Sequence, residues 1–393
     1  MARGRLGTAT KNKLGIVCYP PHFCGKSTLA SQFLYMHNED GSPMKVLYID
    51  CESGSIDYYL DEIEANGGNT KELLLIYSQS LAEVLSFIDR VKNNEDFYTF
   101  DEDTGEETDE VFLDAKGNPW RPDAIVIDGI TVLHQSVQAG LIEFSKKRAR
   151  VKADDAQLTG DAKLVKVEGA GLEIKDRGTI KQKGSSLILS LLATGVHWMV
   201  TARATDEKKS VKTADGQITS VPTGKIVPEG WVDLSYNCHT LIRLEREDDG
   251  EIVAHVEKDR SGVHPYEDVY NPSLLDWQVV IDKSKNKKDF VIKNDLDSAI
   301  VTEQEMYARE VMGRASKPLT KEDLEKELEG NTTETRTPKE IITEINGLLK
   351  SVALPEKQAI RAKVKEAGLP DSFARVTDAE VLNKILEIVK ANI

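Results

Sequence analysis

Short apolar runs alternate with amphipathic stretches along the first two thirds of the chain. The runs are typical of buried strands, and the stretches between them carry apolar residues at helical spacing. The predicted strands are 14–18, 45–52, 73–78, 123–135 and 196–204, and the predicted helices are 27–37, 55–68, 81–94 and 185–195. Strands that alternate with helices indicate βαβ units, so we expect an α/β fold with a mainly parallel central sheet.

Three other stretches depart from this alternation. The acidic insertion at about 95–122 contains turn signals and favours a surface hairpin or a flexible excursion over core. Residues 238–260 read as two strands joined at an Asp-Asp-Gly turn. The pattern changes near residue 283, which predicts a core domain over 1–282, a polar linker with helical segments over 283–337, and a small C-terminal helical module over 338–393.

Composition and charge narrow the class of protein. The 393-residue chain has a formal net charge of −15, which argues against a protein that coats nucleic acid by bulk charge but leaves local basic segments open. No apolar run approaches the roughly 18–20 residues of a membrane span, and no signal-peptide core is evident. The four cysteines lack paired or zinc-type spacing, so we expect reduced, buried thiols and a cytoplasmic protein.

A phosphate-binding loop is indicated where the first predicted strand meets the first predicted helix. Gly-Lys-Ser at such a junction lets backbone N–H groups surround a phosphate, with Lys26 bridging the β- and γ-phosphates of ATP and the Ser27 hydroxyl on Mg²⁺. Pro20 replaces the usual first glycine and, like Pro21, lacks an N–H, so the anion-facing amides come from 22–27. The alternative is a degenerate loop that no longer binds nucleotide. The candidate nucleotide-binding residues are Pro21, His22, Phe23, Cys24, Gly25, Lys26, Ser27 and Thr28.

Two acidic residues at predicted strand ends complete the candidate chemistry. Asp128 follows four apolar residues in a Walker B pattern, which predicts a carboxylate held to Mg²⁺ through water. Glu52 comes just past the strand 45–52, predicted beside the first strand, where it can orient and deprotonate the water that attacks the γ-phosphate. The alternative is that Asp50 and Glu52 cap the next helix; for Asp50 we favour a structural role.

The order of these motifs resembles a known family. Gly-Lys-Ser, then "YIDCE", "IVIDG", "WMVTARA" and "KDRSG" are similar to the ATPase core of RecA-type recombinases, and most of all to the short RecA-like phosphate-loop ATPases of bacteriophage recombination modules, over about residues 13–282. The resemblance implies a RecA-like core that uses ATP and Mg²⁺ and a protein located in the cytoplasm of a bacterial host.

The resemblance also implies roles for individual residues. Glu52 matches the family's catalytic glutamate, and Arg203, or Thr201 near it, lies where the family has a γ-phosphate sensor. Lys258 and Arg260 match a cation pair that reaches into a neighbouring subunit's ATP site, which implies a homo-oligomer, either a filament or a ring. The alternative for that pair is a solvated strand end.

The segments that follow the Walker B and sensor strands are long and basic. The resemblance implies that they are DNA-facing loops, and their near lack of aromatic residues indicates contacts to the nucleic-acid backbone with little sequence preference. The alternative is a set of solvated helix faces. The candidate DNA-binding residues are Lys146, Lys147, Arg148, Arg150, Lys181, Lys183, Lys208 and Lys209.

Together, the motifs and the resemblance predict an ATP-dependent recombination ATPase that binds single-stranded DNA. It would anneal or exchange strands, or load a partner annealing or single-strand-binding protein, with ATP hydrolysed at subunit interfaces. Two alternatives stay open: a hexameric helicase or motor-type ATPase, and a non-hydrolysing, ATP-gated scaffold for replication or recombination proteins.

Overall fold

The computed structural model divides the chain into two compact units, Met1–Glu305 and Met306–Ile393. The described residues are 5–21, 23–52, 54–212, 218–231, 233–291, 296–311, 342, 344–345, 348–349, 354–367, 369–370 and 379–392.

The first unit is built on an eight-stranded sheet with two separate two-stranded ribbons. The strands of the sheet are β1 Gly15–Tyr19, β2 Val46–Asp50, β3 Leu73–Tyr77, β6 Ala124–Asp128, β7 His197–Thr201, β10 Thr240–Arg246, β11 Ile252–Asp259 and β12 Asp268–Tyr270. The ribbon strands are β4 Tyr98–Phe100 and β5 Glu107–Val111 in one, and β8 Ala204–Lys212 and β9 Ile218–Pro228 in the other.

The sheet has the order β12-β11-β10-β1-β7-β6-β2-β3. Every pairing from β10 to β3 is parallel, and β11 and β12 form an antiparallel edge, so the predicted α/β class with a mainly parallel sheet is confirmed. The prediction that the strand before Glu52 lies beside the first strand was wrong. β2 pairs with β6 because both sides of β1 are occupied by the later strands β7 and β10.

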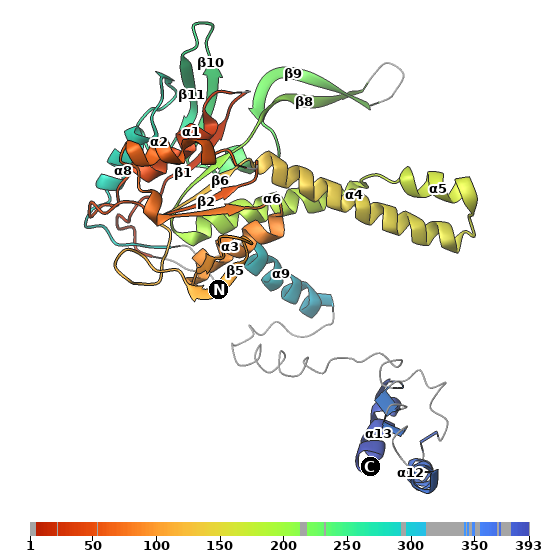
Figure 1. Cartoon of the computed structure of the whole chain (residues 1–393). Helices are drawn as coiled ribbons and strands as arrows, with labels where there is room; N and C mark the ends of the chain where they lie inside the picture. The colour runs from red at the N-terminus through yellow and green to blue at the C-terminus, as the bar shows by residue number, and fades with distance from the viewer. Residues whose placement is uncertain are drawn as a thin grey trace. The chain divides into compact units, whose positions relative to one another are not determined.

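Helices cover both faces of this sheet (Figure 1). The described helices are α1 Lys26–Ser31, α2 Leu60–Ala65, α3 Leu81–Asn93, α4 Ile130–Asp155, α5 Gly160–Glu168, α6 Ile174–Thr194, α7 Asp233–Asn237, α8 Gln278–Asp282, α9 Leu296–Val311, α12 Leu354–Glu366 and α13 Ala379–Lys390, with short 3₁₀ helices η1 Gln32–Tyr35, η2 Asp57–Tyr59, η3 Thr70–Glu72 and η4 Leu274–Trp277.

The core lies in two apolar layers, one on each side of the sheet. Strands β1, β2, β6 and β7 are buried along their whole lengths. Because successive side chains of a strand point to opposite faces, alternate residues enter opposite layers. Val17 and Ile127 pack with apolar residues of α3, α4 and α6, whereas Cys18 and Val126 pack with those of α1, α2 and α8. Burial on both faces explains why these strands read as continuous apolar runs.

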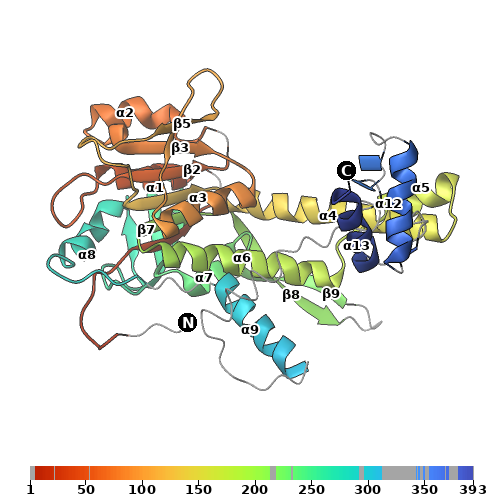
Figure 2. The same cartoon turned by 90° about the horizontal axis from the view of Figure 1, so that it is seen from below.

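The segment after β6 is helical, which corrects two expectations. The strand predicted over 123–135 ends at Asp128, and α4 begins at Ile130 after Gly129, whose φ of 98° is left-handed. The basic segments expected to be DNA-facing loops lie in α4 and α6 instead. These segments are polar on most sides, so they show little of the apolar stripe by which a core-packed helix is identified in a sequence. Figures 1 and 2 show α4 and α6 lying alongside each other beyond the sheet, with α5 beside α4.

Two ribbons extend from the core. The acidic insertion forms the expected hairpin, β4–β5, and its base is anchored by Phe97 and Trp120, which are fully buried. The second ribbon, β8–β9, begins shortly after β7. The segment expected to be a DNA-facing loop here is therefore paired β-structure over its described residues.

Residues beyond 282 fall in both units. The chain near Lys288 pairs with Thr10, so the core unit includes part of the predicted linker, and α9 lies within that linker. Residues 312–337 lie outside the described residues. In the second unit, α12 and α13 share an apolar cluster that includes Ile360 and Ile385.

Candidate active site

The loop between β1 and α1 has the backbone shape of an anion cradle. Phe23 and Gly25 both have left-handed φ angles, 54° and 79°, and α1 begins at Lys26 directly after them. Such turns direct successive N–H groups into one concavity. The loop is tied to the β8–β9 ribbon, because the Ala204 N–H donates to the Pro20 carbonyl at 3.1 Å. His22 lies outside the described residues.

Asp128, at the end of β6, is the most buried acid of the site, with no exposed surface. Its carboxylate accepts hydrogen bonds from the hydroxyls of Tyr48 at 2.8 Å, Ser55 at 2.7 Å and Thr201, and the Lys26 ammonium lies 3.2 Å away. Burial alone would raise the pKa of Asp128, but Lys26 and these hydrogen bonds outweigh it and hold the pKa below its ordinary value. The carboxylate is therefore ionised.

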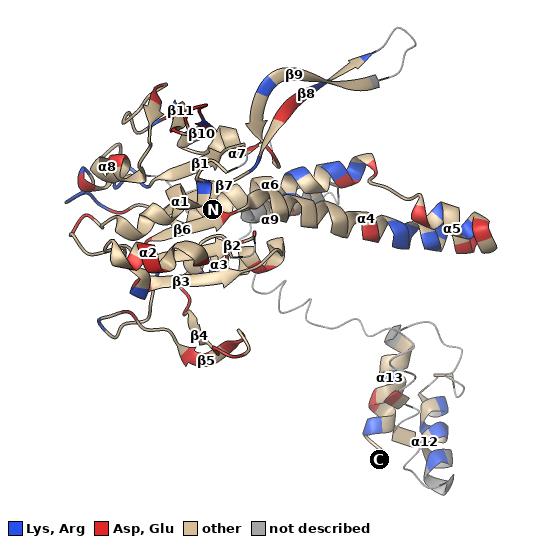
Figure 3. Ribbon diagram, turned by 45° about the horizontal axis from the view of Figure 1, so that its top comes forward, with Lys and Arg blue, Asp and Glu red and all other residues tan. Residues whose placement is uncertain are grey.

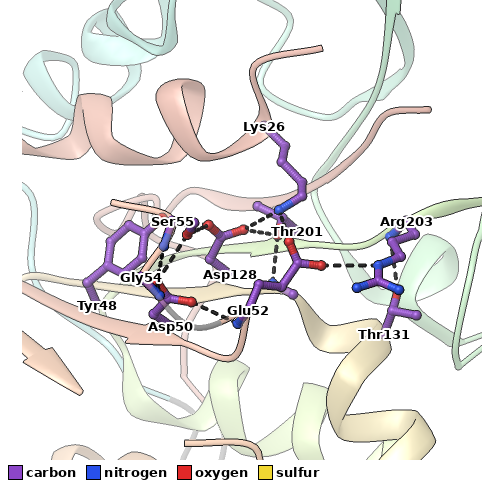
Figure 4. A network of polar contacts seen from close by, with 11 residues as sticks. Lys26, Tyr48, Asp50, Glu52, Gly54, Ser55, Asp128, Thr131, Thr201 and Arg203 are labelled. Carbon is purple, nitrogen blue, oxygen red and sulfur yellow. Dashed lines mark hydrogen bonds and ion pairs between the residues drawn. The ribbon is translucent and has the colours of Figure 1, made fainter. Parts of the chain in front are cut away.

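The pKa of the Lys26 ammonium is shifted in the direction that also favours its charged form. Burial alone would lower the pKa of its ammonium group, but Asp128 and Glu52 raise it above the ordinary value. Lys26 is therefore charged and lies between two carboxylates (Figure 4). A phosphate that reaches the loop meets a cation that is already in place.

Glu52 follows β2 and contacts Lys26 through one carboxylate oxygen, while the other accepts from the Arg203 Nε at 3.2 Å. The turn that carries Glu52 is held by Asp50, which accepts from the backbone N–H groups of Glu52 at 2.8 Å and Gly54 at 2.9 Å. Asp50 thus shapes the turn, and Glu52 faces the site (Figure 4). Gly129 leaves the room that Glu52 needs, because a Cβ there would lie 2.4 Å from the Glu52 Cγ.

Two side chains at and just after the end of β7 are placed differently. Thr201 is fully buried, donates to Asp128 and accepts from the Gly129 N–H at 2.8 Å. Arg203 is 47% exposed at its side chain and reaches Glu52, while its backbone N–H donates to Thr131 Oγ1 at 2.9 Å. Of the two candidates for a phosphate sensor, Arg203 is therefore the one whose cation faces open space.

A cleft of about 1070 Å³ lies over this cluster. Its walls come from the phosphate loop, the turn after β2, the end of β7, the base of the β8–β9 ribbon and the end of β10. The candidate nucleotide-binding residues Pro21, Phe23, Cys24, Gly25, Lys26, Ser27 and Thr28 all line it, together with Glu52 and Arg203. The phosphate loop, the turn after β2, the ribbon base and the end of β10 are far apart in sequence and therefore meet at one opening only through the fold.

The donor set fits Mg²⁺. The Ser27 hydroxyl lines the cleft and hydrogen-bonds to Asp128, which is buried directly beneath it, so two hard oxygen donors lie together. Mg²⁺ typically takes one or two protein oxygens and completes its shell with waters and substrate phosphates. Among the described residues, no group of three or more His, Cys, Asp or Glu side chains is arranged to hold a metal ion.

Lys258 and Arg260 lie away from this cleft. Asp259 pairs with Thr240 at the start of β10, whereas Arg246 at the other end of β10 borders the cleft. The Lys258 ammonium donates to the backbone carbonyls of Ser235 at 3.1 Å and Tyr236 at 2.9 Å, at the end of α7. Arg260 is exposed. Neither residue joins the site of its own chain.

The candidate DNA-binding residues separate into two groups. Lys146 pairs with Glu143 and Glu168, and Arg148 pairs with Asp176, whose pKa its guanidinium lowers to about 2. The others are exposed and form no ion pair among the residues that the structure describes: Lys147, Arg150, Lys181, Lys183, Lys208 and Lys209. Figure 3 shows basic and acidic residues interleaved along α4, α5 and α6.

Sequence reasoning missed three side chains of the site. Tyr48 lies within a strand pattern and Ser55 within a predicted helix start, so neither carries a signal of its own. Arg246 donates to the Phe23 carbonyl from Nε at 3.2 Å and from Nη2 at 2.8 Å. It lies at the end of the first strand of a predicted antiparallel pair, and only the position of β10 beside β1 brings it to the loop.

Comparisons with known proteins find similar solved structures but no match in sequence. No family model matches the chain, and no curated protein matches it in sequence. Among solved structures, a KaiC-like protein of the hyperthermophilic archaeon Pyrococcus horikoshii OT3 is similar with a TM-score of 0.34 and 12% identity, over 65% of this chain and 88% of that protein. A TM-score this low assigns neither a family nor a function. Within the described residues, every helix is too short or too polar to cross a membrane.

Proposed function

We propose that this protein is a RecA-like ATPase that hydrolyses ATP in the cleft above Lys26. The observation that carries the proposal is the convergence of a charged lysine, an ionised buried aspartate, an accessible glutamate and an exposed arginine beside an anion-binding loop. Cations stabilise the charge on a transferring phosphoryl group, and carboxylates can serve a metal ion and the attacking water.

Each residue then has a role. Lys26 and Arg203 bind the phosphates, and Glu52 orients and deprotonates the attacking water. Ser27, and Asp128 through water, would hold Mg²⁺, which when bound neutralises charge on the phosphates. Lys26 and Arg203 both contact Glu52, so a triphosphate in the cleft would compete for both cations and leave the carboxylate free to act as a base.

We further propose that the ATPase is oligomeric, binds single-stranded DNA and serves recombination, by annealing or exchanging strands or by loading a partner protein. The exposed cations of α4, α6 and β8 support the DNA contact, because side chains that are not held in ion pairs are available to phosphates. The β8–β9 ribbon supports coupling between the two sites, because its base lines the cleft.

Single-stranded DNA is expected to stimulate ATP turnover. Steady-state hydrolysis is measured with and without single-stranded DNA, and with duplex DNA as the control. The proposal is supported if ATP hydrolysis is stimulated by single-stranded DNA but not by duplex DNA. Unwinding of the duplex that depends on ATP favours the helicase alternative, and tight ATP binding with no turnover under any condition favours the scaffold.

Charge reversal on α4 is expected to weaken DNA binding. The double variant Lys147→Glu with Arg150→Glu should bind a single-stranded oligonucleotide about tenfold more weakly at low salt, with a shallower dependence on salt concentration. The matched control is Lys71→Glu with Lys285→Glu, which changes the net charge equally at exposed positions away from α4. Equal affinity in the two double variants would exclude α4 from the DNA contact.

A further inference from the structure

The phosphate loop of this chain lacks two of its usual internal supports. Pro20 and Pro21 have no N–H, so neither can donate a backbone hydrogen bond at the start of the loop. Phe23 has a left-handed φ of 54°, which is unfavourable for a residue with a Cβ. Its side chain is 91% exposed, so packing of the ring does not hold this conformation. A contact from outside the loop must therefore hold it.

Arg246 makes that contact. The parallel register that pairs Tyr19 with Arg243 carries the end of β10 past the end of β1, beside the loop. There the guanidinium donates to the Phe23 carbonyl from Nε and Nη2, at 3.2 and 2.8 Å. The Cys24 thiol also hydrogen-bonds to the backbone of Arg246, so the loop is joined to β10 at two successive residues.

We propose that Arg246 is a positioning residue that holds the phosphate loop in its binding shape. This inference rests on the proposed ATPase function and adds to it the device that replaces the missing glycine. The Phe23 carbonyl and the Cys24 N–H belong to one planar peptide and point in opposite directions. Holding the carbonyl towards Arg246 therefore turns the Cys24 N–H away from Arg246 and fixes the orientation of an amide in the cradle.

An arginine suits this task better than a lysine. Its planar group presents two N–H donors to one oxygen, whereas an ammonium on a flexible stem does not fix the direction of the carbonyl. Because the guanidinium is engaged by Phe23, Arg246 acts through the loop and not on the reacting phosphate. Its loss should thus weaken ATP binding more than it slows the chemical step.

Thiol labelling tests the position of the loop without nucleotide. All four cysteines, Cys18, Cys24, Cys51 and Cys238, are buried and free of disulfides. In the full chain, Arg246→Ala should increase the labelling rate of Cys24 by about tenfold, with the other three unchanged, and Arg246→Lys should lie between that variant and the wild type. Arg177→Ala, which removes an exposed arginine from α6, serves as the control and should label like the wild type.

Kinetics give the second readout. Arg246→Ala should raise KM for ATP by about tenfold while kcat stays within about threefold of wild type.

Two results would overturn the inference. One is a Cys24 labelling rate in Arg246→Ala that equals the wild-type rate. The other is a fall in kcat with KM unchanged, because that pattern places Arg246 on the reacting phosphate. If labelling increases at all four cysteines, the alanine variant has unfolded. The Cys24 labelling rate, KM and kcat of Arg246→Lys then test the inference by the same criteria. A wild-type protein that binds no ATP refutes the proposed function, whereas the labelling result still decides the role of Arg246.

Discussion

Replacing Glu52 by glutamine is expected to abolish ATP turnover while ATP binding is retained. A glutamine keeps the size of the side chain and an oxygen that can accept from Arg203, but it cannot take a proton from water. Loss of a general base typically lowers kcat by about 10²–10⁴. Removing the negative charge also frees Lys26 from one of its two ion pairs, so the affinity for ATP should stay equal or increase.

The measurement pairs equilibrium binding of Mg·ATP with single-turnover hydrolysis. Glu62→Gln is the matched control, since Glu62 is an exposed carboxylate on α2 and should behave like the wild type. A kcat for Glu52→Gln within about threefold of wild type would remove Glu52 from the chemistry. Loss of binding and turnover together would instead assign Glu52 to the placement of Lys26.

The chemistry of this site could be read from the sequence because it lies at the ends of buried parallel strands. Continuous apolar runs locate β2 and β6, and the acids that end them, Asp50 and Asp128, come into register because parallel strands end at the same edge. Asp128 is buried beneath the cleft, with its carboxylate 3.2 Å from the Lys26 ammonium, and Glu52, two residues past Asp50, also contacts Lys26. Motif and strand pattern were sufficient to bring these groups together.

The features that could not be predicted from the sequence are those that depend on tertiary contacts. The order of the strands depends on which later strand occupies each side of β1, and no local pattern carries that information. The ion pair between Arg148 and Asp176 joins α4 to α6, so a cation that looked available for DNA is in fact engaged. The polar character of α4 and α6 similarly hid their helical structure, because the apolar stripe that identifies a helix is weak there.

The placement of Arg260 supports a site completed by a second copy of the chain. Arg260 lies near the start of β10, and Arg246 lies at its end beside the phosphate loop. Six residues of extended strand separate these ends by about 20 Å, so Arg260 does not reach the cleft of its own chain. Arg260 is exposed and therefore accessible to another molecule, whereas Lys258 is engaged with the carbonyls of α7.

Mixing two inactive variants is therefore expected to restore ATP hydrolysis. Arg260→Ala alone should lower kcat by about 10³–10⁵, the range for loss of a catalytic arginine supplied from outside the site, and Glu52→Gln alone should be inactive. In an equimolar mixture with random assembly, an interface has both an intact Glu52 and an intact Arg260 in about a quarter of cases, so the rate should recover to about a quarter of wild type. The control is Glu52→Gln mixed with the double variant Glu52→Gln with Arg260→Ala, in which every site lacks the carboxylate. No recovery in the equimolar mixture, or a dilute monomer of Arg260→Ala that hydrolyses ATP at the wild-type rate, would refute a shared site.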